Sequence, residues 1–532
     1  MAAKKRKPLS FSTTLRNPER IASFLDVLSM YEGQILNNEV IENICCQVII
    51  KKLYKPNGVK SNAVFSQIYN SEETTFSIVQ ARQILIDNPQ KHKEKGFDYG
   101  WPSRFDTWYK LLKEFGFCYY RIDAPIEISP LGIRLLEAYH QNPVDEDTIH
   151  NVFLNSLAKF QTSTPFRQNL NSNVPLMLLL NVIKILRQEL GDDFSGIYRK
   201  EISLFLCWKD SNAEELAQYI LNLRRQYRFN YSDEQIYEKC LELFLDDETT
   251  DINQLTNYIK MSKLLMESTD EYIRKMRITG IVSLRGNGRF LDWNTFKLDK
   301  IYYLINNYSE FELFTDEREF YNYISVIDEA LYESEEIPDT TDLKKRVIAR
   351  YAAEYDNEKI ISELNILTHR NSRTDDEMLR FMDAPVRLEF LSAIALVKCF
   401  NHIVVCPNYP VDDEGLPTST ARGGMADIVC YQNDNFALVE VTLMTGAANQ
   451  TEHEMTSIED HLIAAAENED SFVFAIFIAP VLQGRALRYM RFANQDTLAQ
   501  YENCGGIVAM KISEMIDRFV SANNDLRALL NS

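Results

Sequence analysis

Residues 424–442 read GMADIVCYQNDNFALVEVT, two apolar runs on either side of a polar turn. Both runs are rich in Val, Ile, Leu and Phe, which predicts two buried strands joined by a hairpin at residues 432–435. Asp427 and Glu440 lie in these runs, 13 positions apart. An ionised carboxylate inside a sheet is costly unless it is paired, hydrogen-bonded or bound to a cation. The stretch therefore predicts an α/β domain with two carboxylates on neighbouring strands.

A divalent metal would compensate both carboxylates at once. Mg²⁺ is a hard ion that prefers oxygen ligands and keeps several waters for chemistry. Asp427 and Glu440 are positioned across the hairpin to share one such ion. The alternative is that each carboxylate caps a strand end or pairs with Arg422.

Helices are predicted on both sides of this hairpin. Residues 387–397 are apolar almost all round, which indicates a buried helix that carries a third acid, Glu389. Residues 446–467 predict a second helix, followed by a strand at residues 472–479. One polar stripe on the second helix consists of Gln450, Glu454, Ser457 and His461. The stripe either faces the acidic hairpin or is a solvated surface.

Together these residues resemble the AlwI-type type IIS restriction and nicking endonucleases, a branch of the PD-(D/E)XK nucleases related to FokI. The matching features are Glu389, Asp427, the run 440–442, Gln450 with Glu454, and the strand end at 477–480. The opening segment 10–21, with residues 31–33, is also similar to that family. These matches at both ends span nearly the whole chain. The resemblance implies Mg²⁺-dependent phosphodiester hydrolysis.

Two positions depart from the general nuclease pattern. Thr442 stands where the motif normally has Lys, so no lysine in this strand orients the attacking water. Gln450 and His461 are the candidates to take over that role. Ala426 replaces the Pro that usually precedes the motif aspartate.

Composition limits the remaining possibilities. At 532 residues and 45% hydrophobic content, the chain is expected to form two to four globular domains. Its nine cysteines include no CxxC pair, which favours a reduced cytoplasm. No secretory leader and no apolar span of 18 residues is apparent, so no membrane association is expected. The seven histidines are not paired with cysteines at zinc spacing.

Charge is distributed unevenly along the chain. The formal net charge is −20, although DNA-binding proteins draw much of their affinity from Lys and Arg. Residues 1–60 carry a net charge of +5, and residues 310–342 carry −11. We predict a DNA-recognition region at residues 1–300, an acidic helical linker at residues 301–369 and a PD-(D/E)XK nuclease domain at residues 370–532.

The N-terminal half shows a helix followed by a hairpin in two places, near residues 105–132 and 273–291. This order is typical of winged-helix subdomains, so the predicted fold is a mainly α, winged-helix-like recognition half joined to an α/β, restriction-endonuclease-like domain. Asn287-Gly288 is a strong hairpin signal. Arg285 and Arg289 flank this turn and are predicted to contact DNA phosphates.

A helix is predicted to begin at Asn17, with Pro18 in its first turn. Arg16 and Arg20 would then lie beside free backbone N–H groups, which form an anion site. Three interpretations of these residues remain open: phosphate contact, readout of a guanine edge by Arg16, and ordinary surface charge.

The sequence therefore favours a modular DNA endonuclease. Asp427, Glu440 and Glu454 are the predicted Mg²⁺ ligands, with Glu389 as a further ligand or a supporting carboxylate, and Thr442, Gln450 and His461 complete the predicted catalytic set. The resemblance implies a short asymmetric duplex site, GGATC- or GAGTC-like, cut a few base pairs to one side, and a companion methyltransferase. One centre cuts one strand, so double-strand cleavage needs a homodimer or a second nuclease subunit, and otherwise the protein nicks.

Two alternatives come from other functional classes. One is a winged-helix DNA-binding regulator with an inactive nuclease-like domain, which Thr442 supports. Retention of four acids in apolar settings argues against it, because apolar replacements are often stabilising. The other is a repair nuclease without sequence preference.

Overall fold

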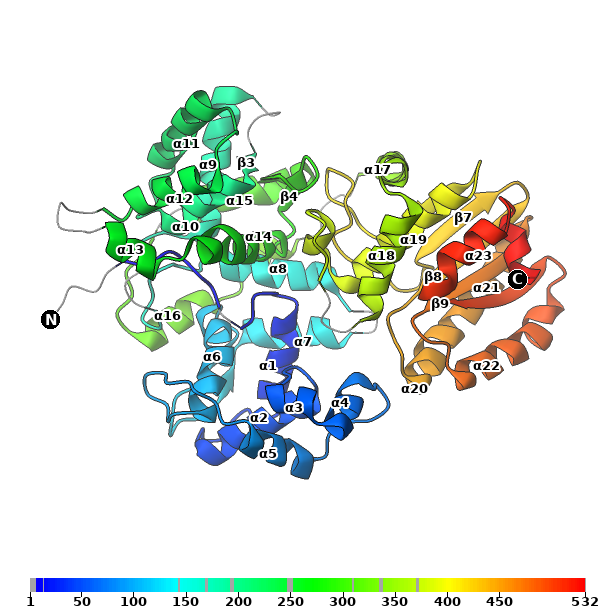
Figure 1. Cartoon of the computed structure of the whole chain (residues 1–532), viewed down its shortest axis with the longest axis horizontal. Coiled ribbons are helices and arrows are strands. Elements are labelled where there is room, and N and C mark those ends of the chain that lie inside the picture. The colour runs from blue at the N-terminus through cyan, green and yellow to red at the C-terminus, as the bar shows by residue number, and fades with distance from the viewer. Residues whose placement is uncertain are drawn as a thin grey trace. The chain divides into compact units, whose positions relative to one another are not determined.

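The computed structural model describes residues 6–531 apart from 13, 142–143, 168–170, 192–195, 246–251, 309–310, 334–337 and 370–372 (Figure 1). The chain forms two compact units, residues 1–60 with 76–336, and residues 61–75 with 337–532. The predicted linker 301–369 spans the boundary at residues 336/337. Its helices thus belong to both units.

The N-terminal unit is mainly helical. Buried apolar side chains hold its helices together, and aromatic pairs such as Phe11 with Phe160 and Phe24 with Trp108 lie in its core. Its helices are α1 (Arg20–Ser29), α2 (Asn38–Ile50), α3 (Asn57–Ser61), α5 (Ile78–Asp87), α6 (Trp101–Glu114), α7 (Pro130–His140), α8 (Glu146–Leu157), α9 (Pro175–Leu190), α10 (Ile202–Cys207), α11 (Ala213–Tyr227), α12 (Asp233–Glu242), α13 (Ile252–Tyr258), α14 (Thr269–Arg277), α15 (Leu298–Asn307) and α16 (Glu317–Ile324).

Both predicted helix–hairpin segments are present in this unit. α6 is followed by the antiparallel pair β1 (Cys118–Tyr119) and β2 (Glu127–Ile128). α14 is followed by β4 (Val282–Arg285) and β5 (Phe290–Trp293), and β3 (Ile197–Tyr198) pairs with β5 from a distant part of the sequence. The turn of the second hairpin has positive φ at residues 286–288, which explains its Gly-Asn-Gly sequence. The winged-helix assignment itself stays a prediction.

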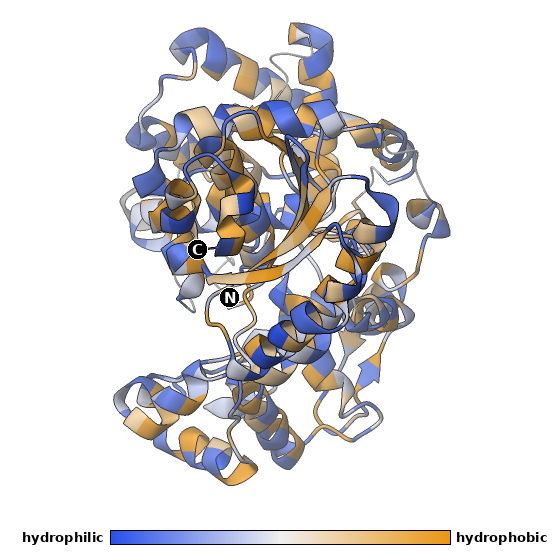
Figure 2. Ribbon diagram, turned by 90° about the vertical axis from the view of Figure 1, so that its right-hand side faces the viewer, coloured by the Kyte–Doolittle hydropathy of each residue, from blue (hydrophilic) through white to orange (hydrophobic). Residues whose placement is uncertain are grey.

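The C-terminal unit contains a five-stranded mixed sheet in the order β10-β9-β8-β7-β6. Its strands are β6 (Val404–Pro407), β7 (Ile428–Gln432), β8 (Asn435–Val441), β9 (Phe472–Ala479) and β10 (Cys504–Lys511). The β7–β8 hairpin predicted from residues 424–442 is confirmed, with Val429 opposite Leu438. β8, β9 and β10 run parallel, which explains their nearly continuous apolar sequences (Figure 2).

Helices cover this sheet, and the period-2 alternation of β8 separates its two faces. Phe436 and Leu438 belong to one apolar cluster with Leu462 of α21 (Thr456–Asn468) and Ala486 of α22 (Gly484–Gln495). α19 (Ala384–Cys399) contacts β6 and β8, and packs with α17 (Thr341–Glu354), α18 (Asn357–Thr368) and α23 (Met515–Ser521). The short helix α4 (Ala63–Asn70) belongs to this unit as well.

The helix predicted at residues 446–467 forms in three successive segments. A short α20 (Ala447–Asn449) leads into the π-helical segment η7 (Gln450–Met455), and α21 follows. A π-helical turn takes one residue more than an α-helical turn. The four-residue spacing expected between Gln450 and Glu454 is therefore not kept on one face.

All nine cysteines carry free thiols, six of them buried, in agreement with the absence of CxxC pairs. Among the helices that the structure describes, none has the length and apolar character needed to cross a membrane.

Glu201 holds together a buried polar cluster in the N-terminal unit. It accepts hydrogen bonds from Arg224 at 2.9 and 2.7 Å and from Tyr231 at 2.5 Å, and its side chain is fully buried. Removing one partner of a buried ion pair leaves an uncompensated charge, so we expect Glu201→Ala to destabilise this unit by about 3–5 kcal/mol. Calorimetric unfolding would show the loss. The exposed Glu214→Ala, in the same unit, should leave the transition in place.

Candidate active site

Four carboxylates from four elements lie close enough to influence one another in the C-terminal unit. α19 contributes Glu389, the residue before β7 is Asp427, β8 contributes Glu440, and η7 contributes Glu454. Glu389 is 3% exposed and Glu440 is 7% exposed, whereas Asp427 and Glu454 are partly exposed. The acids that the sequence analysis selected are therefore brought together.

The hairpin fixes Asp427 and Glu440 against each other. The backbone N–H of Val441 donates to Asp427 Oδ2 at 2.8 Å, and the backbone N–H of Asp427 lies 3.4 Å from Glu440 Oε2. Glu389 accepts a hydrogen bond from the backbone N–H of Ala421 at 3.0 Å. Backbone N–H groups thus supply one hydrogen bond to each of these three carboxylates.

Burial nevertheless disfavours the ionised forms of three of these acids and raises their pKa values. Burial, followed by the negative charges of Glu389 and Glu440, raises the pKa of Asp427 well above its usual value. Burial also raises the pKa of Glu389 to about 8, and the charge of Glu440 acts in the same direction. Burial raises the pKa of Glu454 against the opposing hydrogen bond from Thr442. A divalent cation would reverse this balance by favouring the ionised forms.

His461 and Thr442 each support one of these acids. His461 Nδ1 lies 2.9 Å from Glu440 Oε1, and this hydrogen bond raises the pKa of His461. Thr442 is buried and forms a side-chain hydrogen bond with Glu454. The position that usually holds the motif lysine is therefore used to hold a carboxylate.

Gln450 lies away from the acids. It is fully buried, and its amide nitrogen donates to the carbonyls of Met444 at 2.8 Å and Val481 at 2.7 Å. Its amide oxygen accepts from the backbone N–H of Gln483 at 3.1 Å. Gln450 therefore ties the loop after β8 to the loop after β9, and it has no hydrogen bond to a carboxylate in the described chain.

Within the described residues, no three His, Cys, Asp or Glu side chains converge in a way that could hold a metal ion. The donor set still suits Mg²⁺, because several hard oxygen ligands lie together where burial and neighbouring negative charge disfavour ionisation of Glu389 and Asp427. The assignment of Asp427, Glu440 and Glu454 as metal ligands stays a prediction.

One contact near this site was missed by the sequence analysis. Glu72 Oε2 accepts hydrogen bonds from the backbone N–H groups of Thr445 at 2.6 Å and Gly446 at 2.7 Å. Glu72 belongs to the segment 61–75, which is part of the C-terminal unit although it lies far away in sequence. No sequence pattern could indicate this pairing.

The DNA-contact residues predicted near the N-terminus are already engaged within their own unit. α1 begins at Arg20, three residues later than expected, because residues 17–19 form a turn. Arg16 pairs with Glu267 at 2.7 Å, and Asn17 donates to Glu19 at 2.6 Å. Arg20 donates to the carbonyl of Leu53. Arg16 and Arg20 remain at the surface, and their role in DNA contact stays a prediction.

Arg285 and Arg289 differ in their surroundings. Arg285 pairs with Asp292 at 3.0 Å and donates to the carbonyl of Trp293 at 2.9 Å, so its head group stabilises the β4–β5 hairpin. Arg289 is exposed at the turn, where its Nε donates to the carbonyl of Gly286 at 3.0 Å. Of the two, Arg289 is the better placed for a phosphate.

A family model described as AlwI restriction endonuclease matches residues 113–347 and 335–516. No curated protein sequence matches the chain.

Three solved structures show weak similarity. The small subunit (R.BspD6I2) of the heterodimeric restriction endonuclease R.BspD6I is 18% identical, with a TM-score of 0.26, and the match covers 33% of this chain and 87% of that chain. The restriction endonuclease FokI is 11% identical, with a TM-score of 0.27 and 97% of both chains covered. FokI bound to DNA is 10% identical, with a TM-score of 0.25, and the match covers 99% of this chain and 98% of that chain. These similarities are too weak to establish a shared fold.

The raised pKa of Glu389 predicts a pH-dependent stability when divalent metal is removed. A carboxyl whose folded pKa is raised stabilises the fold at low pH, and this stability is lost as pH rises from its unfolded pKa near 4.3 through the folded value of about 8. In EDTA, Glu389→Gln should therefore exceed the wild type in stability by about 2–4 kcal/mol near pH 7.5. At pH 4 the two proteins should be equal.

Denaturant unfolding at both pH values measures this difference. Glu502→Gln, an exposed change in the same unit, should match the wild type throughout. A destabilised Glu389→Gln protein at pH 7.5 would mean that Glu389 is compensated as an anion.

Proposed function

The chain belongs to the AlwI restriction endonuclease family, and from this premise we propose that it is a type IIS site-specific DNA endonuclease that uses Mg²⁺. The observation that carries the proposal is the cluster of four acids around the β7–β8 hairpin, with like charges held in a largely buried site. Type IIS enzymes bind a short asymmetric duplex sequence and cut a few base pairs to one side.

The proposed metal ligands are Asp427, Glu440 and Glu454, with Glu389 as a further ligand or a carboxylate that supports them. When bound there, Mg²⁺ would activate a water molecule and offset charge that develops on the scissile phosphate. Glu389 and Glu440 are buried, and in such a poorly solvated site the attraction between a bound cation and the phosphate would be stronger than in water.

Three other residues position these acids. His461 orients Glu440, Thr442 orients Glu454, and Gln450 fixes the loop after β8. With Thr442 in place of the motif lysine, His461 is the remaining predicted residue with an ionisable nitrogen beside the cluster. We infer that it acts through Glu440.

The chain has one such cluster in its described part, so cleavage of both strands would require a second copy or another nuclease subunit. A companion methyltransferase and a GGATC- or GAGTC-like site are extensions of the family assignment. A regulator with an inactive nuclease domain is the competing function, and Thr442 is the observation in its favour. A repair nuclease would use the same acids without a fixed sequence.

Asp427→Ala should abolish cleavage of supercoiled plasmid in Mg²⁺ while it keeps DNA binding, because it removes a proposed ligand from the centre of the cluster. Run-off sequencing of every break measures the outcome, with EDTA as the parallel control. Breaks at one offset from one motif identify a restriction enzyme, and scattered breaks identify a repair nuclease. Cleavage that survives in Asp427→Ala would refute the assignment, and tight binding by a wild type that never cuts would favour the regulator.

His461→Ala should lower the cleavage rate about 10–100-fold, as is typical when a residue that orients a metal ligand is lost. The Mg²⁺ concentration for half-maximal activity should rise, since Glu440 loses its orienting partner. His369→Ala is the matched control, because His369 is an exposed histidine of the same unit that hydrogen-bonds to the carbonyl of Asn365 at the end of α18. An unchanged Mg²⁺ requirement with a slower rate would instead give His461 a direct role at the reacting atoms.

A further inference from the structure

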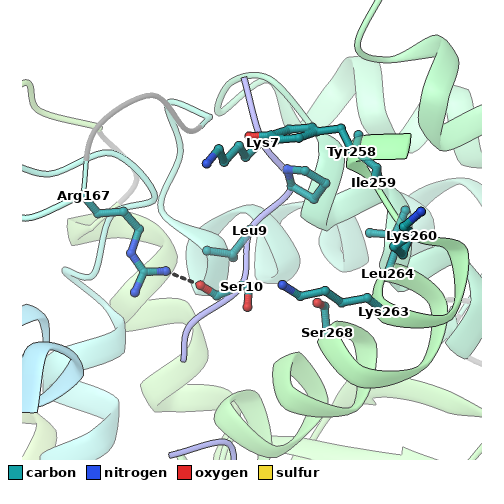
Figure 3. A pocket seen from close by; sticks show the side chains of 11 residues that line it. Lys7, Leu9, Ser10, Arg167, Tyr258, Ile259, Lys260, Lys263, Leu264 and Ser268 are labelled. Atoms are coloured by element: carbon teal, nitrogen blue, oxygen red, sulfur yellow. Dashed lines mark hydrogen bonds between the residues drawn. The ribbon is translucent and has the colours of Figure 1, made fainter. Parts of the chain in front are cut away.

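A second site lies in the N-terminal unit, outside the acidic cluster. It is a cavity of about 350 Å³ between the extended N-terminal segment and the helices that precede α14 (Figure 3). We call it the N-terminal pocket, and its lining includes Lys7, Leu9, Arg167, Tyr258, Lys260 and Lys263.

The N-terminal pocket is strongly basic in a chain whose net charge is −20. Among the residues described by the structure, its lining includes three lysines and one arginine and no carboxylate. Arg167 is neutralised by Glu114, to which it donates at 3.0 and 2.5 Å. Lys7, Lys260 and Lys263 are exposed, and within the described chain none of them pairs with a carboxylate. The uncompensated positive charge therefore lies on the rim.

The floor of the pocket is formed by apolar side chains. Leu9, Ile259 and Leu264 are buried beneath the rim. Lys7 lies over the ring of Tyr258 at 5.3 Å, and Lys263 extends from its helix toward Ser10 (Figure 3). Lys263 begins the π-helical segment η3 (Lys263–Ser268), a geometry frequently found at functional sites.

Buried ion pairs hold the N-terminal segment in place along one wall. Arg167 donates to the carbonyls of Ser10 and Phe11. Glu271 accepts from the backbone N–H of Ser12 at 2.7 Å, and buried Lys275 donates to the carbonyl of Leu15 at 2.9 Å. A ligand would therefore meet a wall that is already ordered, which lowers the entropic cost of binding.

We propose that the N-terminal pocket binds the sugar-phosphate backbone of duplex DNA, with Lys7 and Lys263 as the phosphate contacts and Lys260 at the outer rim. The inference rests on the proposed function and assigns a DNA contact to residues outside the predicted recognition set. Flexible lysines at an open rim match a phosphate as point charges, and the apolar floor matches deoxyribose. Such contacts position a protein on DNA without reading its sequence.

The test measures binding of full-length protein to a labelled 30-bp duplex in EDTA, so that cleavage does not interfere. The wild type, Lys7→Ala/Lys263→Ala and the charge-preserving Lys7→Arg/Lys263→Arg are titrated over a range of salt concentrations. Lys91→Ala/Lys95→Ala is the matched control, because it removes two exposed lysines from the same unit, outside the pocket. The duplex carries either the cleavage motif or a scrambled sequence.

Loss of two phosphate contacts should reduce the slope of log K against log salt by about 1–2. Affinity should fall about 3- to 30-fold on both duplexes, with the Arg variant and the control close to the wild type. An unchanged slope in Lys7→Ala/Lys263→Ala, or an equal change in the control, overturns the proposal. So does calorimetric binding of dAMP or inorganic phosphate that needs Lys7 and Lys263 while the DNA slope stays constant.

The two proposals fail in different ways. If the plasmid assay shows cleavage and the slope is unchanged, the endonuclease function stands and the pocket assignment is wrong. If the slope falls in Lys7→Ala/Lys263→Ala but the wild type never cuts DNA, the pocket assignment stands and the endonuclease function is wrong.

Discussion

The burial of neighbouring carboxylates is the constraint on which the site in the C-terminal unit depends. Burial, followed by the negative charges of Glu389 and Glu440, disfavours ionisation of Asp427, and burial together with the charge of Glu440 disfavours ionisation of Glu389. Backbone N–H groups of Ala421 and Val441 offset only part of that cost. In the proposed function, a hard divalent cation bound to these oxygen ligands would offset this cost.

The surrounding structure then serves to keep these acids in fixed positions. His461 holds Glu440, Thr442 holds Glu454, and Gln450 joins two loops at the edge of the sheet. None of these contacts is large in energy, yet each removes freedom from a side chain beside the cluster. The acidic cluster lies within residues 335–516, which the AlwI restriction endonuclease family model matches.

The N-terminal unit has a basic pocket although the chain as a whole is acidic. The net charge is −20, yet the rim of this pocket carries three lysines. Buried pairs such as Arg167 with Glu114 neutralise charge that serves the fold, whereas the rim lysines stay available to solvent. Net charge alone is therefore a poor guide to whether such a chain binds a polyanion.

Periodicity in the sequence determined the β7–β8 hairpin, the buried α19 and the two helix–hairpin segments, because each depends on residues close together in the chain. It also selected Asp427, Glu440 and Glu389, since a carboxylate inside an apolar run is conspicuous, and it selected Glu454 from the polar stripe of the helix that follows the hairpin. Only the tertiary structure decided the role of Gln450, because a π-helical segment shifts the register of its helix. The contact of Glu72 with residues 445–446 and the pocket between residues 7–10 and 258–268 were likewise decided by packing across long sequence separations, which local patterns do not encode.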